Sequence, residues 1–169
     1  EPSLRGRPLV VLSNGDGCVV SRTEEAKALG VKMGQPMFQL RYLVRSKGLV
    51  ARSSNYELYA EISDRFMSLA AGLGPLIEQY SIDESWLGDL DGIKDLTRRA
   101  HAIRSRILRW VGIGSGVGIA PSKTLAKLCN LVAKNSSRKP GSYPSELAYV
   151  CNWADLDPDT RRLLLQRTE

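Results

Sequence analysis

The chain has 169 residues, of which 43% are hydrophobic and 25% charged, and 24 basic against 18 acidic residues give a net charge of +6. This composition excludes a chain without a hydrophobic core and predicts one or two small globular units. The positive charge favours a polyanionic partner such as nucleic acid, or an anionic membrane surface, over an acidic protein role.

The first 30 residues predict a strand pair followed by a short helix. Apolar runs at residues 8–12 and 18–20 flank the glycine-rich segment 13–17, which is the pattern of a β-hairpin. Residues 23–30 begin with a capping threonine, carry acids in the first turn and end in glycine, the signals that bound a helix.

Residues 55–69 predict a longer helix with one apolar face, because apolar residues recur there at three- and four-residue steps. These residues are Leu58, Ile62, Phe66 and Leu69. Glycine and proline at residues 72–75 end the helix, and residues 76–82 and 85–87 predict two strands that flank an acidic pair. We expect Tyr42, Tyr56 and Tyr59 to be packing residues rather than platforms for base stacking.

Strands and helices continue to alternate after this pair. Residues 94–110 predict an amphipathic helix, residues 110–120 a buried glycine-rich strand, residues 122–134 a further helix and residues 138–144 a connector. The arginines of the first of these helices fit a DNA-phosphate surface and an ordinary polar face equally well, and His101 beside them is assigned no role. The alternation predicts an α/β fold, an α+β sheet with packed helices.

The cysteines and the hydropathy pattern indicate the cellular compartment to expect. Cys18, Cys129 and Cys151 are odd in number and far apart, which argues against a disulfide framework or a zinc site. No apolar run reaches the roughly 18 residues that span a bilayer, and no signal peptide opens the chain. We therefore expect a cytoplasmic protein without a membrane partner. The first residue is Glu1 and no element closes the chain, so we expect a fragment with two cut ends.

The acidic pair Asp83-Glu84 is the first candidate for chemistry. Adjacent carboxylates after an apolar strand are costly unless they are solvated, paired or metal-bound. Neighbouring side chains of a regular strand point to opposite faces, so both acids reach one metal only at a turn or bulge. Clustered carboxylates can hold two magnesium ions for phosphoryl transfer. From the pair alone, a solvated hairpin tip is the more frequent outcome.

Five segments in order resemble one enzyme family. Tyr80-Ser81-Ile82-Asp83-Glu84 resembles the YSIDE catalytic motif of Y-family translesion polymerases, and residues 12–19 resemble the SNNDGCV segment of their UmuC branch. Residues 25–34 match its EAKALGVKMG helix, and residues 53–60 match its SSNYELYA helix start. Residues 116–128 resemble GVGIA followed by KTLAKL. The resemblance covers most of residues 3–134 and is much weaker after about residue 140.

The resemblance implies a division of the chain. Residues 1–55 would be a fingers-like region, residues 56–137 most of a palm-like catalytic region, and residues 138–169 a connector and the start of a thumb. The family's first catalytic motif, an aspartate strand, lies upstream of the matching part. The thumb and the little-finger domain would also lie outside this chain.

The resemblance also implies an activity, a DNA-directed DNA polymerase for error-prone translesion synthesis in the bacterial SOS response to DNA damage. Its substrates would be primer-template DNA and an incoming deoxynucleoside triphosphate, and its cofactor Mg²⁺, two ions in the complete enzyme. A processivity clamp and UmuD-like subunits would be accessory partners. Without the first aspartate, this fragment alone would be nearly inactive.

Site residues follow from the matching positions. Asp83 and Glu84 would be catalytic residues and magnesium ligands, and Lys27 and Lys134 would contact the incoming triphosphate, which needs compensating cations. Without the resemblance, either lysine is a solvated helix residue. Lys123 and Lys127, grouped with the last motif, either touch the DNA backbone or face water.

One residue departs from the family pattern. Gly88 is an extra residue before Asp89, and a glycine in a strand predicts a bulge that shifts the register of the hairpin. Asp89 and Asp91 are then turn residues rather than replacement ligands.

Two rival hypotheses stay open. A catalytically inactive polymerase remnant would bind DNA or nucleotide without chemistry. An unrelated phosphate-loop nucleotidase would use Lys123-Thr124, although Ser122 stands where that loop requires glycine. The glycines of residues 112–118 do not have the spacing of a dinucleotide loop.

Overall fold

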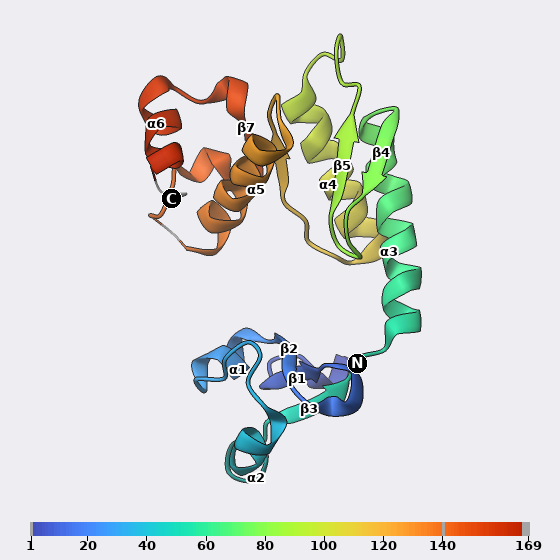
Figure 1. Cartoon of the computed structure of the whole chain (residues 1–169), viewed down its shortest axis with the longest axis vertical. Coiled ribbons are helices and arrows are strands. Elements are labelled where there is room, and N and C mark those ends of the chain that lie inside the picture. Colours follow the sequence, from blue (N-terminus) through green and yellow to red (C-terminus); the bar gives the residue numbers. More distant parts are fainter. Residues whose placement is uncertain (1, 140, 167–169) are drawn as a thin grey trace. The chain divides into compact units, whose positions relative to one another are not determined.

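The computed structural model describes residues 2–139 and 141–166. It divides the chain into two compact units, Glu1–Glu57 and Leu58–Glu169, which are described separately (Figure 1). Residue 140 of the expected connector and the expected cut ends at residues 1 and 167–169 lie outside the described residues.

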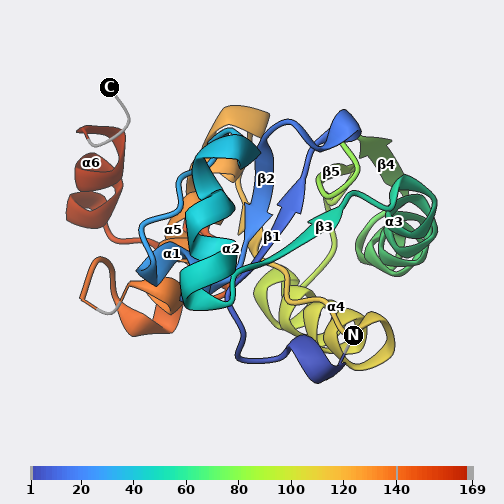
Figure 2. The ribbon, with the colours of Figure 1, turned by 90° about the horizontal axis from the view of Figure 1, so that it is seen from below.

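A three-stranded sheet forms the centre of the first unit (Figure 2). The predicted hairpin is confirmed, since β1 pairs antiparallel with β2, and β3 adds to the other edge of β1 in parallel. The strands are β1 (Leu9–Leu12), β2 (Val19–Arg22) and β3 (Val50–Ser53), and the α-helices are α1 (Glu24–Ala28) and α2 (Arg41–Lys47). Short 3₁₀ helices are η1 (Pro2–Leu4), η2 (Asn14–Asp16) and η3 (Met37–Leu40).

Helix α1 begins where the capping signal predicts. The hydroxyl of Thr23 accepts hydrogen bonds from the backbone N–H groups of Ala26, at 3.3 Å, and of Leu9, at 3.1 Å. The same side chain therefore caps the helix and ties it to the start of β1.

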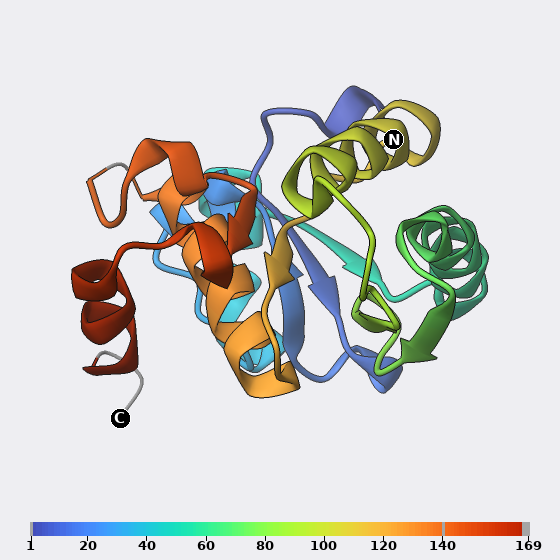
Figure 3. The same ribbon diagram turned by 90° about the horizontal axis from the view of Figure 1, so that it is seen from above.

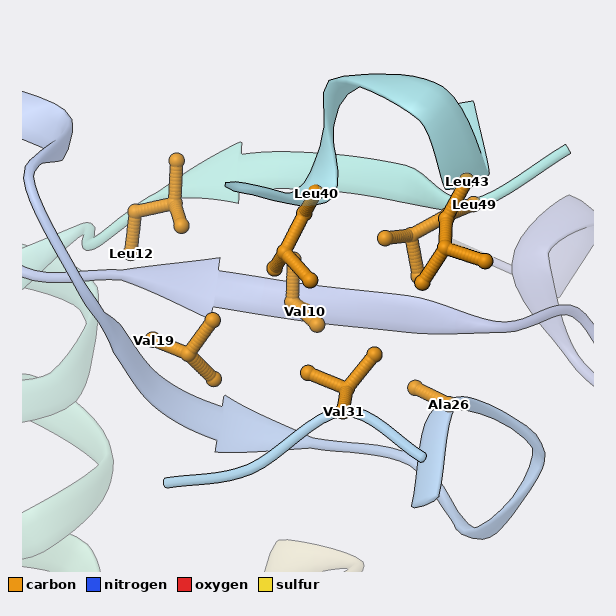
Figure 4. Close-up of a cluster of buried hydrophobic side chains, with 8 residues drawn as sticks. All are labelled: Val10, Leu12, Val19, Ala26, Val31, Leu40, Leu43 and Leu49. Atoms are coloured by element: carbon orange, nitrogen blue, oxygen red, sulfur yellow. The ribbon is translucent and has the colours of Figure 1, made fainter. Parts of the chain in front are cut away.

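Eight buried side chains make the core of the first unit and gather around β1 (Figure 4). They are Val10, Leu12, Val19, Ala26, Val31, Leu40, Leu43 and Leu49. The packing role predicted for Tyr42 is wrong, because its side chain is 63% exposed. Leu40 and Leu43 point into the core of the unit, and Tyr42 therefore lies on the opposite, outer side of α2.

The second unit holds two small sheets and the longest helices. Strand β4 (Leu76–Gln79) pairs antiparallel with β5 (Ser85–Gly88), and β6 (Val117–Ile119) pairs in parallel with β7 (Val150–Asn152). Helix α5 packs against β6 and β7 (Figure 3). The α-helices are α3 (Tyr56–Ala70), α4 (Leu96–Val111), α5 (Lys123–Arg138) and α6 (Pro158–Gln166), and the 3₁₀ helices are η4 (Ala71–Leu73), η5 (Ser145–Leu147) and η6 (Trp153–Asp155).

The apolar face predicted for residues 55–69 is correct only in part. The buried positions of α3 are Ser63, Met67 and Ala70, whereas Leu58 is 46% exposed. The first buried side chain of α3 therefore lies about one turn after Leu58, where the apolar repeat begins. The packing role predicted for Tyr56 is also wrong, because its side chain is 55% exposed. Tyr59 is half-buried.

The strand predicted for residues 110–120 is much shorter than expected. Helix α4 continues to Val111 and ends at Gly112, whose φ of 78° is the left-handed conformation of a helix C-cap. Only Val117–Ile119 finds a strand partner, in β7, so the glycine-rich residues before it form a link rather than a strand. The helix predicted for residues 122–134 is confirmed and continues to Arg138.

The bulge predicted at Gly88 is absent. Gly88 pairs directly with Leu76, and the register of β4 and β5 stays continuous to Gln79 and Ser85. A Cβ on Gly88 would lie 3.0 Å from a methyl group of the exposed Leu76 side chain, so this glycine lies in close contact across the hairpin, and its backbone is not left-handed. Asp89 follows with φ of 55°, which agrees with its prediction as a turn residue.

A candidate active site at the β4–β5 turn

Asp83 and Glu84 lie in the turn that joins β4 to β5. The backbone N–H groups of Tyr80 and Ser81 both donate to the carbonyl oxygen of Glu84, each at 3.0 Å. The Ser81 hydroxyl donates to the Asp83 carboxylate at 2.8 Å. Because the backbone turns here, the two neighbouring side chains are freed from the alternation of a strand and both line the same hollow.

Helix α3 is joined to this turn by a side-chain hydrogen bond. The Ser63 hydroxyl, buried on α3, donates to the carbonyl oxygen of Ile82, the residue before the acidic pair. Ser63 directly follows Ile62 of the predicted apolar face, and the sequence assigns it no role. The sequence holds no local signal for this contact, because the burial of Ser63 and its hydrogen bond to Ile82 both depend on the fold.

The hollow beside the turn has a volume of about 710 Å³. Helix α3 and the acidic turn form one part of its wall, and the link before β6 and helix α5 form another. Lys134 on α5 lines it together with Asp83 and Glu84, so three of the four predicted site residues meet at one cavity. The volume lies within the range of about 300–1,000 Å³ that is usual for small-molecule sites.

Lys27, the fourth predicted site residue, belongs to the first unit. It lies on α1, where its ammonium group contacts the Glu24 carboxylate at 2.5 Å. Its side chain is half-exposed, as expected of a solvated helix residue with a neighbour three positions earlier.

Arg104 has a role that the sequence did not indicate. Its guanidinium donates to the carbonyl oxygen of Ser115 at 2.8 Å and lies 3.9 Å from the centre of the Tyr149 ring. It therefore fastens α4 to the link that forms the wall of the hollow. His101 lies exposed on the same helix.

Two buried polar atoms in this wall have no hydrogen-bond partner among the described residues. They are the Ser115 hydroxyl and the side-chain oxygen of Asn130, and both residues line the hollow. Buried polar atoms without partners are costly, so both positions suit a group that brings hydrogen-bonding partners with it.

The acidic turn offers one part of a magnesium site. Carboxylate oxygens are hard ligands of the kind Mg²⁺ prefers, and this ion usually takes only one or two carboxylates and completes its shell with water and phosphate oxygens. Asp83 and Glu84 fit that requirement. Within the described residues no third acid, cysteine or histidine joins them in a potential metal-binding group.

The phosphate-loop hypothesis is not supported at Lys123-Thr124. Ser122 caps α5 through its hydroxyl, which accepts from the Leu125 N–H at 3.3 Å. The Lys123 ammonium, which a phosphate loop would use to bind phosphate, is instead paired with the Glu78 carboxylate at 2.6 Å. No helix within the described residues is both long and apolar enough to span a membrane.

Comparison with known proteins gives a consistent result. The impB/mucB/samB family matches residues 1–130. Protein UmuC of Salmonella typhimurium is 48% identical over 142 residues, which are 82% of this chain and 33% of that protein. Protein ImpB of the same species is 47% identical over 137 residues, 79% of this chain and 32% of that protein. The chain therefore spans about a third of the length of these curated relatives.

Solved structures agree with these sequence matches. The insertion ternary complex of Dbh DNA polymerase has a TM-score of 0.74 and 27% identity, over 99% of this chain and 46% of that one. DinB from Sulfolobus solfataricus has a TM-score of 0.71 and 26% identity, over 100% of this chain and 52% of that one. The expected α/β fold is confirmed by these likenesses.

Proposed function

Because the chain belongs to the impB/mucB/samB family, we propose that it is the fingers and palm portion of a Y-family polymerase that performs error-prone translesion DNA synthesis. The observation that carries the proposal is one hollow lined by Asp83, Glu84 and Lys134. The reaction is attack of a primer 3′-hydroxyl on the α-phosphate of a deoxynucleoside triphosphate, with pyrophosphate as the leaving group. In this proposal residues 1–55 are the fingers-like region, residues 56–137 the palm-like region and residues 138–169 the start of the thumb.

In this proposal the acidic residues bind metal and the lysines bind the triphosphate. Asp83 and Glu84 would hold the two magnesium ions of the complete enzyme, which neutralise charge at the phosphates and activate the primer hydroxyl when bound. Lys134 would bind the triphosphate from the α5 side, and Lys27 would contribute a second cation from the fingers-like region. The substrates are primer-template DNA and the incoming nucleotide.

We further propose that a strand carrying another carboxylate completes the site between β5 and β6. Among the described residues β5 pairs only with β4, and β6 only with β7. A smaller hollow of about 160 Å³ is lined by residues of both β5 and β6 and by Ser115 and Asn130. A strand here would pair with the free edges of β5 and β6, and its backbone groups would supply partners for these two polar side chains.

Partners and cellular setting follow from the same proposal. The native protein would act in the bacterial cytoplasm during the SOS response, with a processivity clamp and UmuD-like subunits as accessory partners. This chain alone would be nearly inactive, because two-metal chemistry needs the further carboxylate.

Primer extension opposite an abasic template base, with the full-length native protein and Mg²⁺, tests the proposal. Asp83→Asn and Glu84→Gln keep the shape of each side chain but remove the charge, and each is expected to lower the rate at least about a hundredfold, since metal-held charges supply several kcal/mol. Asp89→Asn is the matched control, because it changes an acid beyond β5 in a left-handed position that asparagine tolerates.

Two results would count against this function. Normal extension by Asp83→Asn would remove the candidate site from the chemistry. A native protein that binds primer-template DNA but never extends it would favour the inactive remnant instead.

A further inference from the structure

Helix α5 reaches the acidic turn through two lysines that lie one helical turn apart. The Lys123 ammonium contacts Glu78 of β4 at 2.6 Å and lies 5.8 Å from the centre of the Trp86 ring. The Lys127 ammonium contacts Glu84 at 3.4 Å and lies 4.7 Å from the centre of the Tyr80 ring. The two lysines thus make the same kind of contact, but only Lys127 pairs with a proposed metal ligand.

The surroundings of Lys127 hold its ammonium group beside Glu84. The Tyr80 ring attracts the cation through its face, and this ring is itself fixed by an edge contact with Trp86 at 6.0 Å between centres. The Glu84 side chain is only 29% exposed, and that of Lys127 is 53% exposed. Within the part of the chain that the structure describes, Lys127 is the cation that contacts Glu84.

We propose that Lys127 is a positioning residue that serves as the built-in counter-ion of Glu84. Without metal, its ammonium offsets the charge of two adjacent carboxylates and keeps Glu84 turned toward α5. A divalent cation bound to Glu84 competes with this ammonium and is repelled by it, so Lys127 lowers the affinity of the site for metal. This inference rests on the proposed function, because it takes Asp83 and Glu84 as the metal ligands.

The size of the effect follows from the exposure of the pair. Exposed and half-exposed ion pairs are weak because water and salt screen them, and the repulsion between the ammonium and a nearby divalent cation adds to the competition. Removing the ammonium is therefore expected to tighten metal binding about three- to tenfold at low ionic strength, and less at high ionic strength.

Mn²⁺ binding to the full-length native protein, measured by electron paramagnetic resonance of the free ion without DNA or nucleotide, tests the inference. Lys127→Gln is expected to lower the Mn²⁺ dissociation constant by that factor. Lys123→Gln is the matched control, since it removes the same charge and the same kind of contact one turn away, and it should leave the constant within about twofold. The Lys127→Gln effect should disappear in a Glu84→Gln background, which a general loss of folding would not reproduce.

Several results separate the inference from the proposed function. Equal or weaker Mn²⁺ binding by Lys127→Gln, or an equal gain by Lys123→Gln, overturns the counter-ion role. Unchanged Mn²⁺ binding by Asp83→Asn overturns the proposed function itself, whichever way the lysine variants behave.

Discussion

Among the glycines that the structure describes, Gly118 in β6 is the one where an added Cβ would come nearest to another atom. A Cβ at this residue would overlap with the carbonyl oxygen of Ala126 and the backbone nitrogen of Asn130, both on α5. Backbone atoms cannot rotate out of the way as a side chain can. Gly118→Ala therefore forces α5 away from β6. Because Asn130 and Lys134 of the candidate site lie on α5, the substitution also displaces these two residues.

The expected cost comes from this forced separation. Overpacking a closely packed core costs about 1–3 kcal/mol and sometimes more, and a clash with backbone belongs at the upper end, about 3 kcal/mol. Small domains have a free energy of unfolding of about 5–15 kcal/mol, so this is a large share of the total. At about 4–8 °C per kcal/mol, the melting temperature of the unit should fall by roughly 12–24 °C.

Urea and thermal unfolding followed by circular dichroism measure the effect. Gly114→Ala is the matched control, because a Cβ there meets no atom within 4 Å and its backbone is not left-handed. That variant should be neutral or slightly stabilising, since alanine restricts the unfolded chain. If Gly118→Ala unfolds at the same urea concentration as Gly114→Ala, the close approach of β6 and α5 is refuted.

Two further predictions concern side chains away from the candidate site. A thiol reagent should label Cys18 in the native chain and reach Cys129 and Cys151 only after unfolding, because neither of these two side chains is exposed; labelling of all three at once would contradict this. The hydrogen bond between them lowers the pKa of Cys129 and raises that of Cys151, so burial and not thiol acidity is what protects both. Asp157→Ala should speed amide hydrogen exchange at the start of α6, because the Asp157 carboxylate accepts from the N–H of Thr160 at 2.9 Å. Hydrogen bonds from Thr160 lower the pKa of Asp157, so in the unsubstituted chain the stabilisation of α6 by this carboxylate is present at neutral pH and is lost as the pH falls below about 4. Amide exchange that does not change with pH, after correction for its intrinsic rate, would contradict the assignment.

Features fixed by short-range signals could be predicted from the sequence. The cap at Thr23 and the paired apolar runs around residues 13–17 depend on neighbouring residues, and both have their expected structures. The bulge predicted at Gly88 is wrong because a glycine in a strand is compatible both with a bulge and with close packing in a regular strand. The continuous pairing of β4 with β5, in which Gly88 lies opposite Leu76, decides between them. That pairing depends on the distant strand β4 and cannot be inferred from the residues next to Gly88.

Features that depend on distant partners could not be predicted. The arginines of α4 look alike in the sequence, but within the described residues Arg104 is the one that donates to the Ser115 carbonyl, because the chain returns to it after Gly112. The contact of Lys127 with Glu84 spans 43 residues and likewise requires the fold. The meeting of Asp83, Glu84 and Lys134 was expected only from the family resemblance, and their roles stay a prediction.

The arrangement of charge in the hollow restricts what can bind there. An acidic turn alone would attract a cation, and a lysine on a facing wall alone would attract an anion. A free phosphate near Lys134 would be repelled by the two carboxylates, whose charge the single ammonium of Lys127 offsets only in part. A bare metal ion at the turn would gain nothing from Lys134. Under the proposed function, a nucleoside triphosphate that carries a divalent metal would satisfy both parts at once, with the metal toward Asp83 and Glu84 and phosphate oxygens toward Lys134. Affinity for the metal-nucleotide complex should therefore exceed the affinity for either component, and binding of free nucleotide that equals binding of its Mg²⁺ complex would contradict this reasoning.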